Sequence, residues 1–130
     1  MLRILCVDDD GVVLAVTADL LRSLGHDVIE AHGGAAAAEA LRDPSVEILV
    51  TDIHMPDGPG GVQLAAHARR ERPDLPIIFF SGMPYIAPEG VEDIVLRKPC
   101  SLGELQQAIA QATTRILRGG RPSGVSAQYR

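Results

Sequence analysis

Short apolar runs that do not alternate with polar residues are the feature that most constrains this fold. The clearest is Val46–Thr51, in which Ile48–Val50 has no polar interruption. A strand that is apolar on both sides is buried on both faces, which is typical of a parallel sheet covered by helices. The run is followed by Asp52, so a carboxyl group lies directly after a buried strand.

Longer segments with the spacing of amphipathic helices separate these runs. We expect strands over Leu2–Val7, Asp27–Ala31, Val46–Thr51, Leu75–Phe80 and Asp93–Leu96. We expect helices over Val12–Leu24, from Gly33-Gly34 through Leu41, over Gly60–Arg72, and from Ser101 to about Leu117. Ser101 suits an N-cap, because Glu104 occupies the capping-box position three residues later.

Strands that alternate with helices predict an α/β fold. Five such strands suit a flavodoxin-like, doubly wound parallel sheet with strand order 2-1-3-4-5. The chain of 130 residues fits one domain, which we expect over residues 1–118. Residues 119–130 are rich in Gly, Pro, Ser and Arg and have little to bury, so they predict a disordered C-terminal tail.

The composition argues against several classes of function. The net charge is −5 and no basic run stands out, which argues against nucleic-acid binding. No apolar stretch approaches the roughly 20 residues that span a membrane. Cys6 and Cys100 form no disulfide framework, and the N-terminus lacks the apolar region of a signal peptide. A cytoplasmic protein is the expectation.

Polar residues follow the expected strands where a doubly wound sheet binds ligands, at the carboxyl ends. They are Asp8, Asp9 and Asp10 after the first strand, Asp52 after the third, Ser81 after the fourth and Lys98 after the fifth. Mg²⁺ relieves the repulsion between clustered carboxylates. A carboxylate is also a nucleophile for a phosphoryl group, whose oxygens a lysine and a hydroxyl can bind.

Four motifs in this order resemble those of the receiver domains of bacterial two-component response regulators. They are Val7–Asp10, Thr51–Pro56, Phe80–Gly82 and Arg97–Pro99, and the match runs from about Leu2 to Leu117. The resemblance implies a signalling switch rather than an enzyme. A histidine kinase or a histidine phosphotransfer protein would donate the phosphoryl group, and a downstream protein would respond, without a DNA-binding output domain.

The resemblance also implies a role for each residue of the site. Asp52 matches the phosphoryl acceptor, while Ser81 and Lys98 match the residues that bind the phosphoryl oxygens. Mg²⁺ would be held by Asp8, Asp9, Asp52 and the backbone carbonyl of His54. Asp10 matches a third acid of the family that we do not expect to be a direct ligand.

The sequence departs from the family pattern in three places. The loop Asp57–Gly61 has one extra residue. The segment Gly82–Glu92 is short and contains two prolines, which predicts a fourth helix that is short or absent, as in a subclass of receivers. Val95 stands where the family usually has an aromatic residue. We therefore expect phosphorylation to act by ordering a mobile Gly82–Glu92 loop.

Other functions remain open at this point. Asp8–Val12 also resembles the signature of haloacid-dehalogenase-type phosphatases, in which Asp8 would be the nucleophile. The chain lacks room for the cap of those enzymes, and it has no later pair of aspartates. The domain could instead be an interaction module that works without phosphorylation. A flavodoxin-like nucleotide-binding protein is disfavoured because no Gly-rich loop follows the first strand.

Overall fold

The structure is a computed structural model that describes residues 1–55, 60–82, 94–98 and 100–117. The strands are β1 (Arg3–Val7), β2 (Asp27–Ala31), β3 (Ile48–Asp52), β4 (Ile77–Ser81) and β5 (Ile94–Arg97). The helices are α1 (Gly11–Ser23), α2 (Gly34–Ala40), α3 (Gly61–Glu71) and α4 (Leu102–Leu117). These elements follow one another in the order expected from the sequence.

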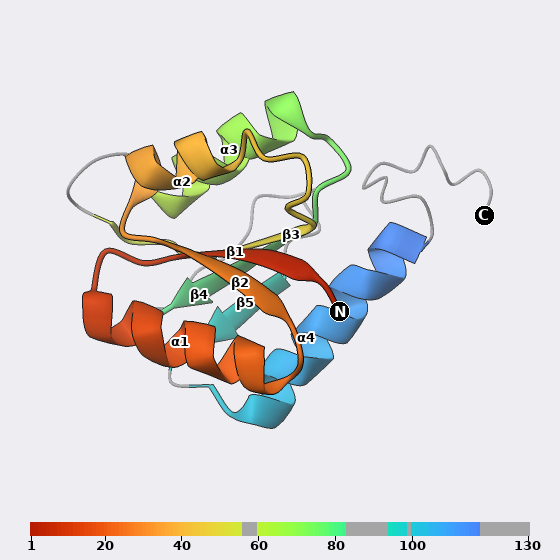
Figure 1. The fold of residues 1–130 in the computed structure, drawn as a ribbon. Helices are drawn as coiled ribbons and strands as arrows, with labels where there is room; N and C mark the ends of the chain where they lie inside the picture. Colours follow the sequence, from red (N-terminus) through yellow and green to blue (C-terminus); the bar gives the residue numbers. More distant parts are fainter. Residues whose placement is uncertain (56–59, 83–93, 99, 118–130) are drawn as a thin grey trace.

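All strands of the sheet are parallel, and their order is β2-β1-β3-β4-β5. This confirms the flavodoxin-like fold that the apolar runs predicted (Figure 1). The chain passes from β1 to its neighbour β2 and then crosses to β3 on the other side of β1, so the direction in which strands are added reverses beside β1. Because every strand points the same way, their carboxyl ends share one edge of the sheet, where such folds bind ligands.

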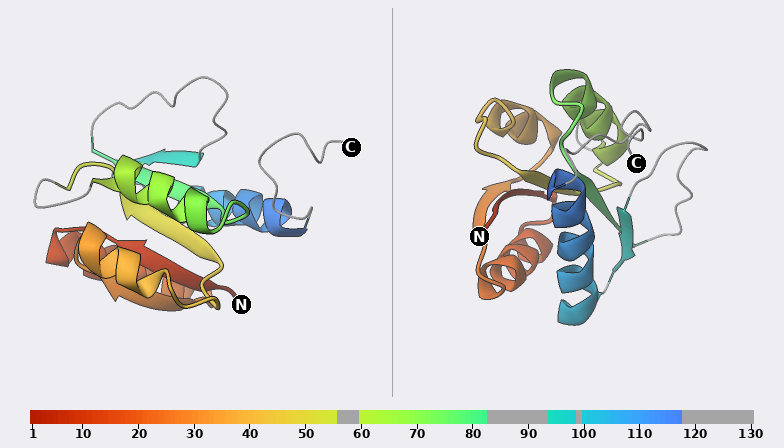
Figure 2. Two further views of the ribbon diagram at one scale, coloured as in Figure 1. Left: turned by 90° about the horizontal axis from the view of Figure 1, so that it is seen from above. Right: turned by 90° about the vertical axis from the view of Figure 1, so that its right-hand side faces the viewer.

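Helices cover both faces of the sheet (Figures 1 and 2). One apolar cluster lies between the sheet and α1 and α4, and it includes Ile4, Cys6 and Leu105. The other lies between the sheet and α2 and α3, and it includes Leu5 and Val7. Successive side chains of a strand point to opposite faces, so a strand buried on both sides has to be apolar throughout.

The ends of two helices are fixed by side chains. Asp10 is the N-cap of α1, and its Oδ1 accepts hydrogen bonds from the N–H groups of Val12 at 2.9 Å and Val13 at 3.2 Å. At the start of α4, Ser101 Oγ accepts from the N–H of Glu104, and Glu104 Oε1 accepts from the N–H of Ser101. The capping box expected at Ser101 is therefore present.

Several expectations fall on residues outside the described ranges. The short or absent fourth helix and the mobile loop concern 83–93, and the C-terminal tail concerns 119–130. The extra residue expected in the loop Asp57–Gly61 falls largely on 56–59. Within the described ranges the bounds differ only slightly: Asp52 and Ser81 are the last residues of β3 and β4 rather than the first residues after them.

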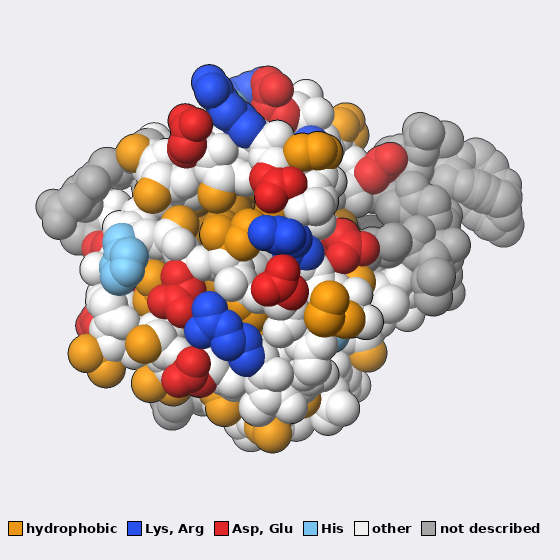
Figure 3. Space-filling model, in the orientation of Figure 1, with side chains coloured by type: hydrophobic (Ala, Val, Ile, Leu, Met, Phe, Trp, Pro, Cys, Tyr) orange, Lys and Arg blue, Asp and Glu red, His pale blue; other side chains and the backbone are white. Residues whose placement is uncertain are grey.

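Charged side chains of both signs lie next to one another on the face shown in Figure 3. Near β2, for example, Arg22 pairs with Glu30 at 2.8 Å and Arg3 pairs with Asp27 at 3.5 Å. Exposed pairs of this kind contribute little to stability but keep a surface well solvated. Of the helices in the described ranges, none has the length and apolar character needed to cross a membrane.

Candidate functional site

The carboxyl ends of β1, β3, β4 and β5 bring the predicted site residues to one edge of the sheet. Asp8 directly follows β1, Asp52 and Ser81 end β3 and β4, and Lys98 directly follows β5. The neighbouring strands hold these ends together through the pairs Val7–Thr51, Asp52–Phe80 and Ser81–Arg97. The sheet thus gathers residues that lie up to 90 positions apart in the chain.

Three carboxylates form the centre of this edge. Asp8 is 3% exposed and Asp52 is 6% exposed, while Asp9 is half-buried. One carboxylate oxygen from each lies within 4.8 Å of the others. Carboxylate oxygens are the hard ligands that Mg²⁺ prefers, and the burial of neighbouring carboxylates such as Asp8 and Asp52 without a cation is costly. The donor set therefore fits a divalent cation.

Lys98 is the positive charge at this cluster. Its Nζ donates to Asp8 Oδ2 at 2.9 Å and lies 3.3 Å from Asp52 Oδ1. Burial alone would lower the pKa of Lys98, but the hydrogen bond and charge of Asp8, together with those of Asp52, raise it above its ordinary value. Lys98 therefore stays charged between the two carboxylates, where a compact ammonium suits phosphoryl oxygens as well.

Asp52 has an unfavourable environment for a carboxylate. Burial, and then the negative charge of Asp8, raise the pKa of Asp52 above its ordinary value. Lys98 and a hydrogen bond from the backbone N–H of His54 act in the opposite direction. A carboxylate in such an environment is stabilised by a nearby cation, and it is also stabilised when a reaction bonds its oxygen to another group. A strongly perturbed carboxyl group of this kind is typical of a functional site.

The remaining predicted residues lie around this centre. Ser81 is fully buried. Its carbonyl accepts a hydrogen bond of 2.8 Å from the backbone N–H of Lys98, which holds the backbone of Lys98 against the end of β4. The side chain of His54 is exposed. The part assigned to the His54 carbonyl as a metal ligand stays a prediction.

Asp10 acts as a helix cap, as an acid at a helix N-terminus can. Its carboxylate binds the first turn of α1, and its own N–H donates to Asp8 Oδ1 at 2.9 Å. Asp10 is exposed and is not among the three acids whose oxygens converge. The three consecutive aspartates thus divide into two members of the acid cluster and one cap that also orients Asp8.

Sequence reasoning missed one residue of the site, Gly61. A Cβ placed on Gly61 would lie only 2.0 Å from the backbone oxygen of Asp52, so a side chain fits there only if the backbone shifts. The signal in the sequence was the Gly60-Gly61 doublet at the start of a helix. A glycine doublet is typical of loops in general, so it did not identify a contact with Asp52.

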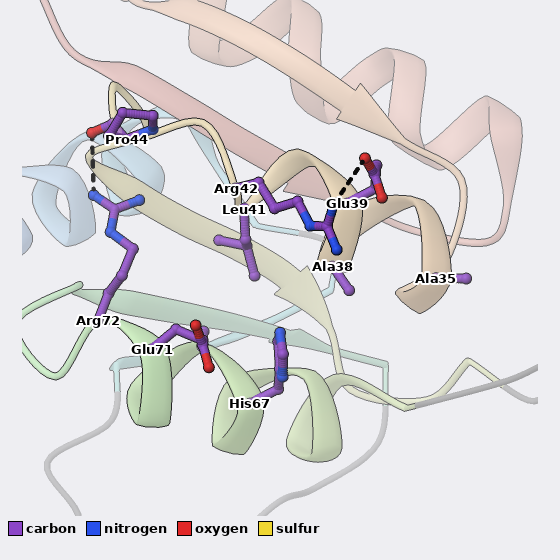
Figure 4. Close-up of a pocket in the computed structure, with 10 residues that line it drawn as sticks. Ala35, Ala38, Glu39, Leu41, Arg42, Pro44, His67, Glu71 and Arg72 are labelled. Atoms are coloured by element: carbon purple, nitrogen blue, oxygen red, sulfur yellow. Dashed lines mark hydrogen bonds and ion pairs between the residues drawn. The ribbon is translucent and has the colours of Figure 1, made fainter.

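Away from this edge, a hollow with a volume of about 700 Å³ lies between α2 and α3 (Figure 4). Its charged lining residues are Glu39, Arg42, Glu71 and Arg72, and His67 lines it as well. Glu39 pairs with Arg42 at 3.8 Å, and Arg72 donates to the carbonyls of Pro44 and Val46. These charges largely compensate one another, and the lining contains none of the residues at the carboxyl edge, so this hollow carries no comparable chemistry.

Comparison with known proteins agrees with this geometry. Residues 4–110 match the model of the response regulator receiver domain. The receiver protein CpdR of Brucella abortus is 34% identical over 114 residues, which cover 84% of this chain and 94% of CpdR. The sensor protein GacS of Pseudomonas syringae is 30% identical over 92% of this chain, but the match covers only 14% of GacS.

Solved structures give the same result. The receiver domain of the hybrid histidine kinase CckA is 30% identical, with a TM-score of 0.72 over 85% of this chain and 97% of that domain. The response regulator TrrA of Thermotoga maritima, solved in complex with Mg²⁺ and BeF, is 23% identical and shares the fold with a TM-score of 0.78 over 86% of this chain and 99% of TrrA. By sequence match and by fold, the chain belongs to the response regulator receiver domain family of two-component systems.

Proposed function

We propose that the chain is a phospho-accepting switch in which Asp52 takes a phosphoryl group from a histidine kinase or a histidine phosphotransfer protein. Receiver domains are signalling switches that histidine kinases phosphorylate, and they bind Mg²⁺ at an acidic pocket. The observation that carries the proposal is the position of Lys98 Nζ, in contact with both Asp8 and Asp52 beside three convergent carboxylates.

The chemistry assigned to each residue follows from that arrangement. An oxygen of the Asp52 carboxylate attacks the phosphorus of a phosphohistidine, the N–P bond breaks, and an acyl phosphate forms. Lys98 and the hydroxyl of Ser81 bind the oxygens of the transferred group. A bound Mg²⁺, held by Asp8, Asp9, Asp52 and the His54 carbonyl, would supply positive charge to these oxygens. Phosphorylation then shifts the domain between two states that a protein partner distinguishes.

Asp52 suits the acceptor role better than Asp8, the nucleophile of the alternative phosphatase hypothesis. Both oxygens of Asp8 are already engaged, Oδ1 by the N–H of Asp10 and Oδ2 by Lys98. The carboxylate of Asp52 has the raised pKa of a group whose charge is poorly solvated. The family assignment supports the same choice.

A protein, rather than a small molecule, suits the role of natural donor. Lys98 lines an apolar hollow of about 430 Å³ beside the site, together with residues of α1. Val12 and Val16 of this helix are 75% and 55% exposed. A donor protein placed over the acid cluster would cover these apolar side chains and remove them from water, which is favourable. The relatives CpdR and GacS, a single receiver and a sensor protein, fit such a pathway.

Labelling with acetyl phosphate and Mg²⁺ tests the acceptor directly. We expect the wild-type chain to gain one hydroxylamine-labile phosphoryl group, and we expect Asp52→Asn to gain none. The matched control is Asp10→Asn, because Asn caps a helix as well as Asp does and position 10 lies outside the acid cluster. This variant should be labelled at close to the wild-type rate.

Two outcomes would contradict the proposal in different ways. Labelling that survives Asp52→Asn and is lost in Asp8→Asn would favour the phosphatase-like alternative. A wild-type chain that binds Mg²⁺ but is never labelled, by acetyl phosphate or by a panel of phosphorylated kinases, would favour an interaction module independent of phosphorylation.

A further inference from the structure

The first residue of α3 lies directly on the backbone of Asp52. A Cβ placed on Gly61 would be 2.0 Å from the carbonyl oxygen of Asp52, 2.9 Å from its carbonyl carbon and 2.9 Å from the Cα of Ile53. Gly61 is buried, and its N–H donates to the carbonyl of Ile53 at 2.9 Å. Helix and strand therefore meet here without an intervening side chain.

The requirement for glycine at this position is one of space. In the described part of the chain, φ is positive only at Gly25 and Gly33, so the backbone of Gly61 is one that other residues can adopt. All three atoms that a methyl group would meet belong to the backbone, which cannot rotate away as a side chain can. A methyl group at residue 61 must therefore move α3, or the end of β3, or both.

The end of β3 is the part whose movement would affect the site. Asp52 is paired with Phe80 of β4, and the N–H of Ile53 donates to the Phe80 carbonyl at 3.0 Å. On the other side, α3 is fixed to its core by Leu64, which is 2% exposed. Asp52 is thus held between β4 and the start of α3, and its carboxylate faces Lys98 at 3.3 Å.

We propose that Gly61 is a positioning residue, whose missing side chain sets the place of the Asp52 carboxylate relative to Asp8, Asp9 and Lys98. This inference rests on the proposed function of Asp52 as phosphoryl acceptor. The oxygens of the three acids converge within 4.8 Å, so a shift of Asp52 changes every distance in the cluster. Misplacement of a reacting group by about 1 Å can reduce a rate roughly 100-fold.

Gly60 provides a matched control in the same turn. A Cβ on Gly60 would lie 3.3 Å from the carbonyl oxygen of Ile53, a contact that a small adjustment relieves. The backbone of Gly60, with φ of −77° and ψ of 175°, is extended and open to any residue. Gly60→Ala therefore adds the same methyl group one position earlier without pressing on Asp52.

Gln63→Ala provides a second control, for the loosening of α3 alone. Gln63 Oε1 accepts a hydrogen bond of 2.9 Å from the N–H of Gly60 at the start of the helix. Its removal weakens that end of α3 but inserts no atom against β3. Any effect that Gly61→Ala shares with Gln63→Ala at equal thermal stability comes from the helix rather than from the position of Asp52.

The experiment measures three quantities for the wild type and the three variants: Mg²⁺ affinity by calorimetry, the rate of labelling by acetyl phosphate at saturating Mg²⁺, and Tm. For Gly61→Ala we expect Mg²⁺ affinity to fall about tenfold and the saturated labelling rate to fall about 100-fold. Gly60→Ala and Gln63→Ala should stay within about threefold of the wild type in both. Wild-type values for Gly61→Ala, or equal losses in Gln63→Ala at the same Tm, would overturn the inference.

Hydrogen exchange on the wild-type chain keeps the inference testable even if Gly61→Ala does not fold. Loading Asp52 with Mg²⁺ and beryllofluoride should increase protection of the amides of Gly61 and Leu64, because coupling between two sites is reciprocal. Unchanged protection of both amides in the loaded domain would contradict it. Failure of the wild type to bind beryllofluoride or to be labelled would instead contradict the acceptor role of Asp52.

Discussion

At the scale of single residues, Lys98 joins the two most buried acids of the site. Its Nζ contacts Asp8 at 2.9 Å and Asp52 at 3.3 Å, and its side chain is 27% exposed. Buried carboxylates that face each other without a cation destabilise a fold, because neither solvent nor a counter-charge compensates them. Lys98 therefore contributes to stability before any ligand binds, in addition to its proposed role toward the phosphoryl group.

Lys98→Met should lower the free energy of unfolding by about 2 kcal/mol in the absence of divalent cations, since it leaves Asp8 and Asp52 unpaired. Mg²⁺ should restore more stability to this variant than to the wild type, because the cation then supplies the positive charge that Lys98 no longer provides to Asp8 and Asp52. Denaturant unfolding with and without Mg²⁺ measures both effects. The control is Arg97→Met, which removes an exposed charge one position earlier. Equal stabilities of Lys98→Met and the wild type would contradict this account.

The sequence was sufficient to predict that Asp8, Asp9, Asp52 and Lys98 lie close together. The prediction needed only parallel strands, because their carboxyl ends meet at one edge whatever the side-chain details are. It was not sufficient for Gly61, because that requirement arises from a contact between α3 and β3 that no local pattern records. The chemical roles of the four polar residues stay predictions that the labelling experiment tests.

At the scale of elements, the three consecutive aspartates have different roles, and Asp10 is the one that caps a helix. Asp10 caps α1 and donates its N–H to Asp8, so the start of the helix and the orientation of an acid in the cluster depend on the same residue. An acid at the N-terminus of a helix also interacts favourably with the helix dipole. The residue type alone does not distinguish cap from ligand here, because carboxylates serve both purposes. The expectation that Asp10 is not a direct ligand came from the resemblance to the receiver family.

Asp10→Ala should cost about 1 kcal/mol of stability through loss of the cap, whereas Asp10→Asn should cost only a few tenths. Mg²⁺ affinity should stay near the wild-type value in Asp10→Asn, and Asp9→Asn should reduce it. Thermal unfolding and calorimetric titration of these variants measure the two effects separately. A loss of Mg²⁺ affinity in Asp10→Asn as large as that in Asp9→Asn would make Asp10 a ligand rather than a cap.

The bounds of the strands depend on their partners rather than on their own residues. Asp52 and Ser81 were expected just beyond their strands, yet the pairs Asp52–Phe80 and Ser81–Arg97 extend β3 and β4 by one residue. In a sequence, a polar residue after an apolar run is taken to mark the end of the strand. In the structure, the strand ends where the hydrogen bonds to its neighbour end. The capping box of α4 was predicted correctly because all its atoms lie within four consecutive residues.

At the scale of the whole molecule, the fold places its buried charge at one edge of an otherwise apolar sheet. Asp8 and Asp52 are the buried acids of the described residues, and each follows or ends a strand whose side chains fill the two apolar cores. Burial and the charge of Asp8 raise the pKa of Asp52 above its ordinary value of 3.8. The whole domain therefore loses stability when Asp52 ionises, and this links the site to the folding equilibrium.

Asp52→Asn should consequently stabilise the domain near neutral pH and raise its Tm above that of the wild type. The folded pKa of Asp52 is raised, so its favourable contribution is complete below the ordinary value of 3.8 and is lost as the pH rises through the raised value. Wild type and variant should thus have the same Tm at low pH and diverge above it. Melting curves in EDTA across this range measure the divergence, with Asp10→Asn as the control that removes an exposed acid. If Asp52→Asn instead melts below the wild type at neutral pH, the attraction of Lys98 outweighs the cost of burying Asp52. The folded state would then stabilise the charged form of Asp52, which would contradict this account.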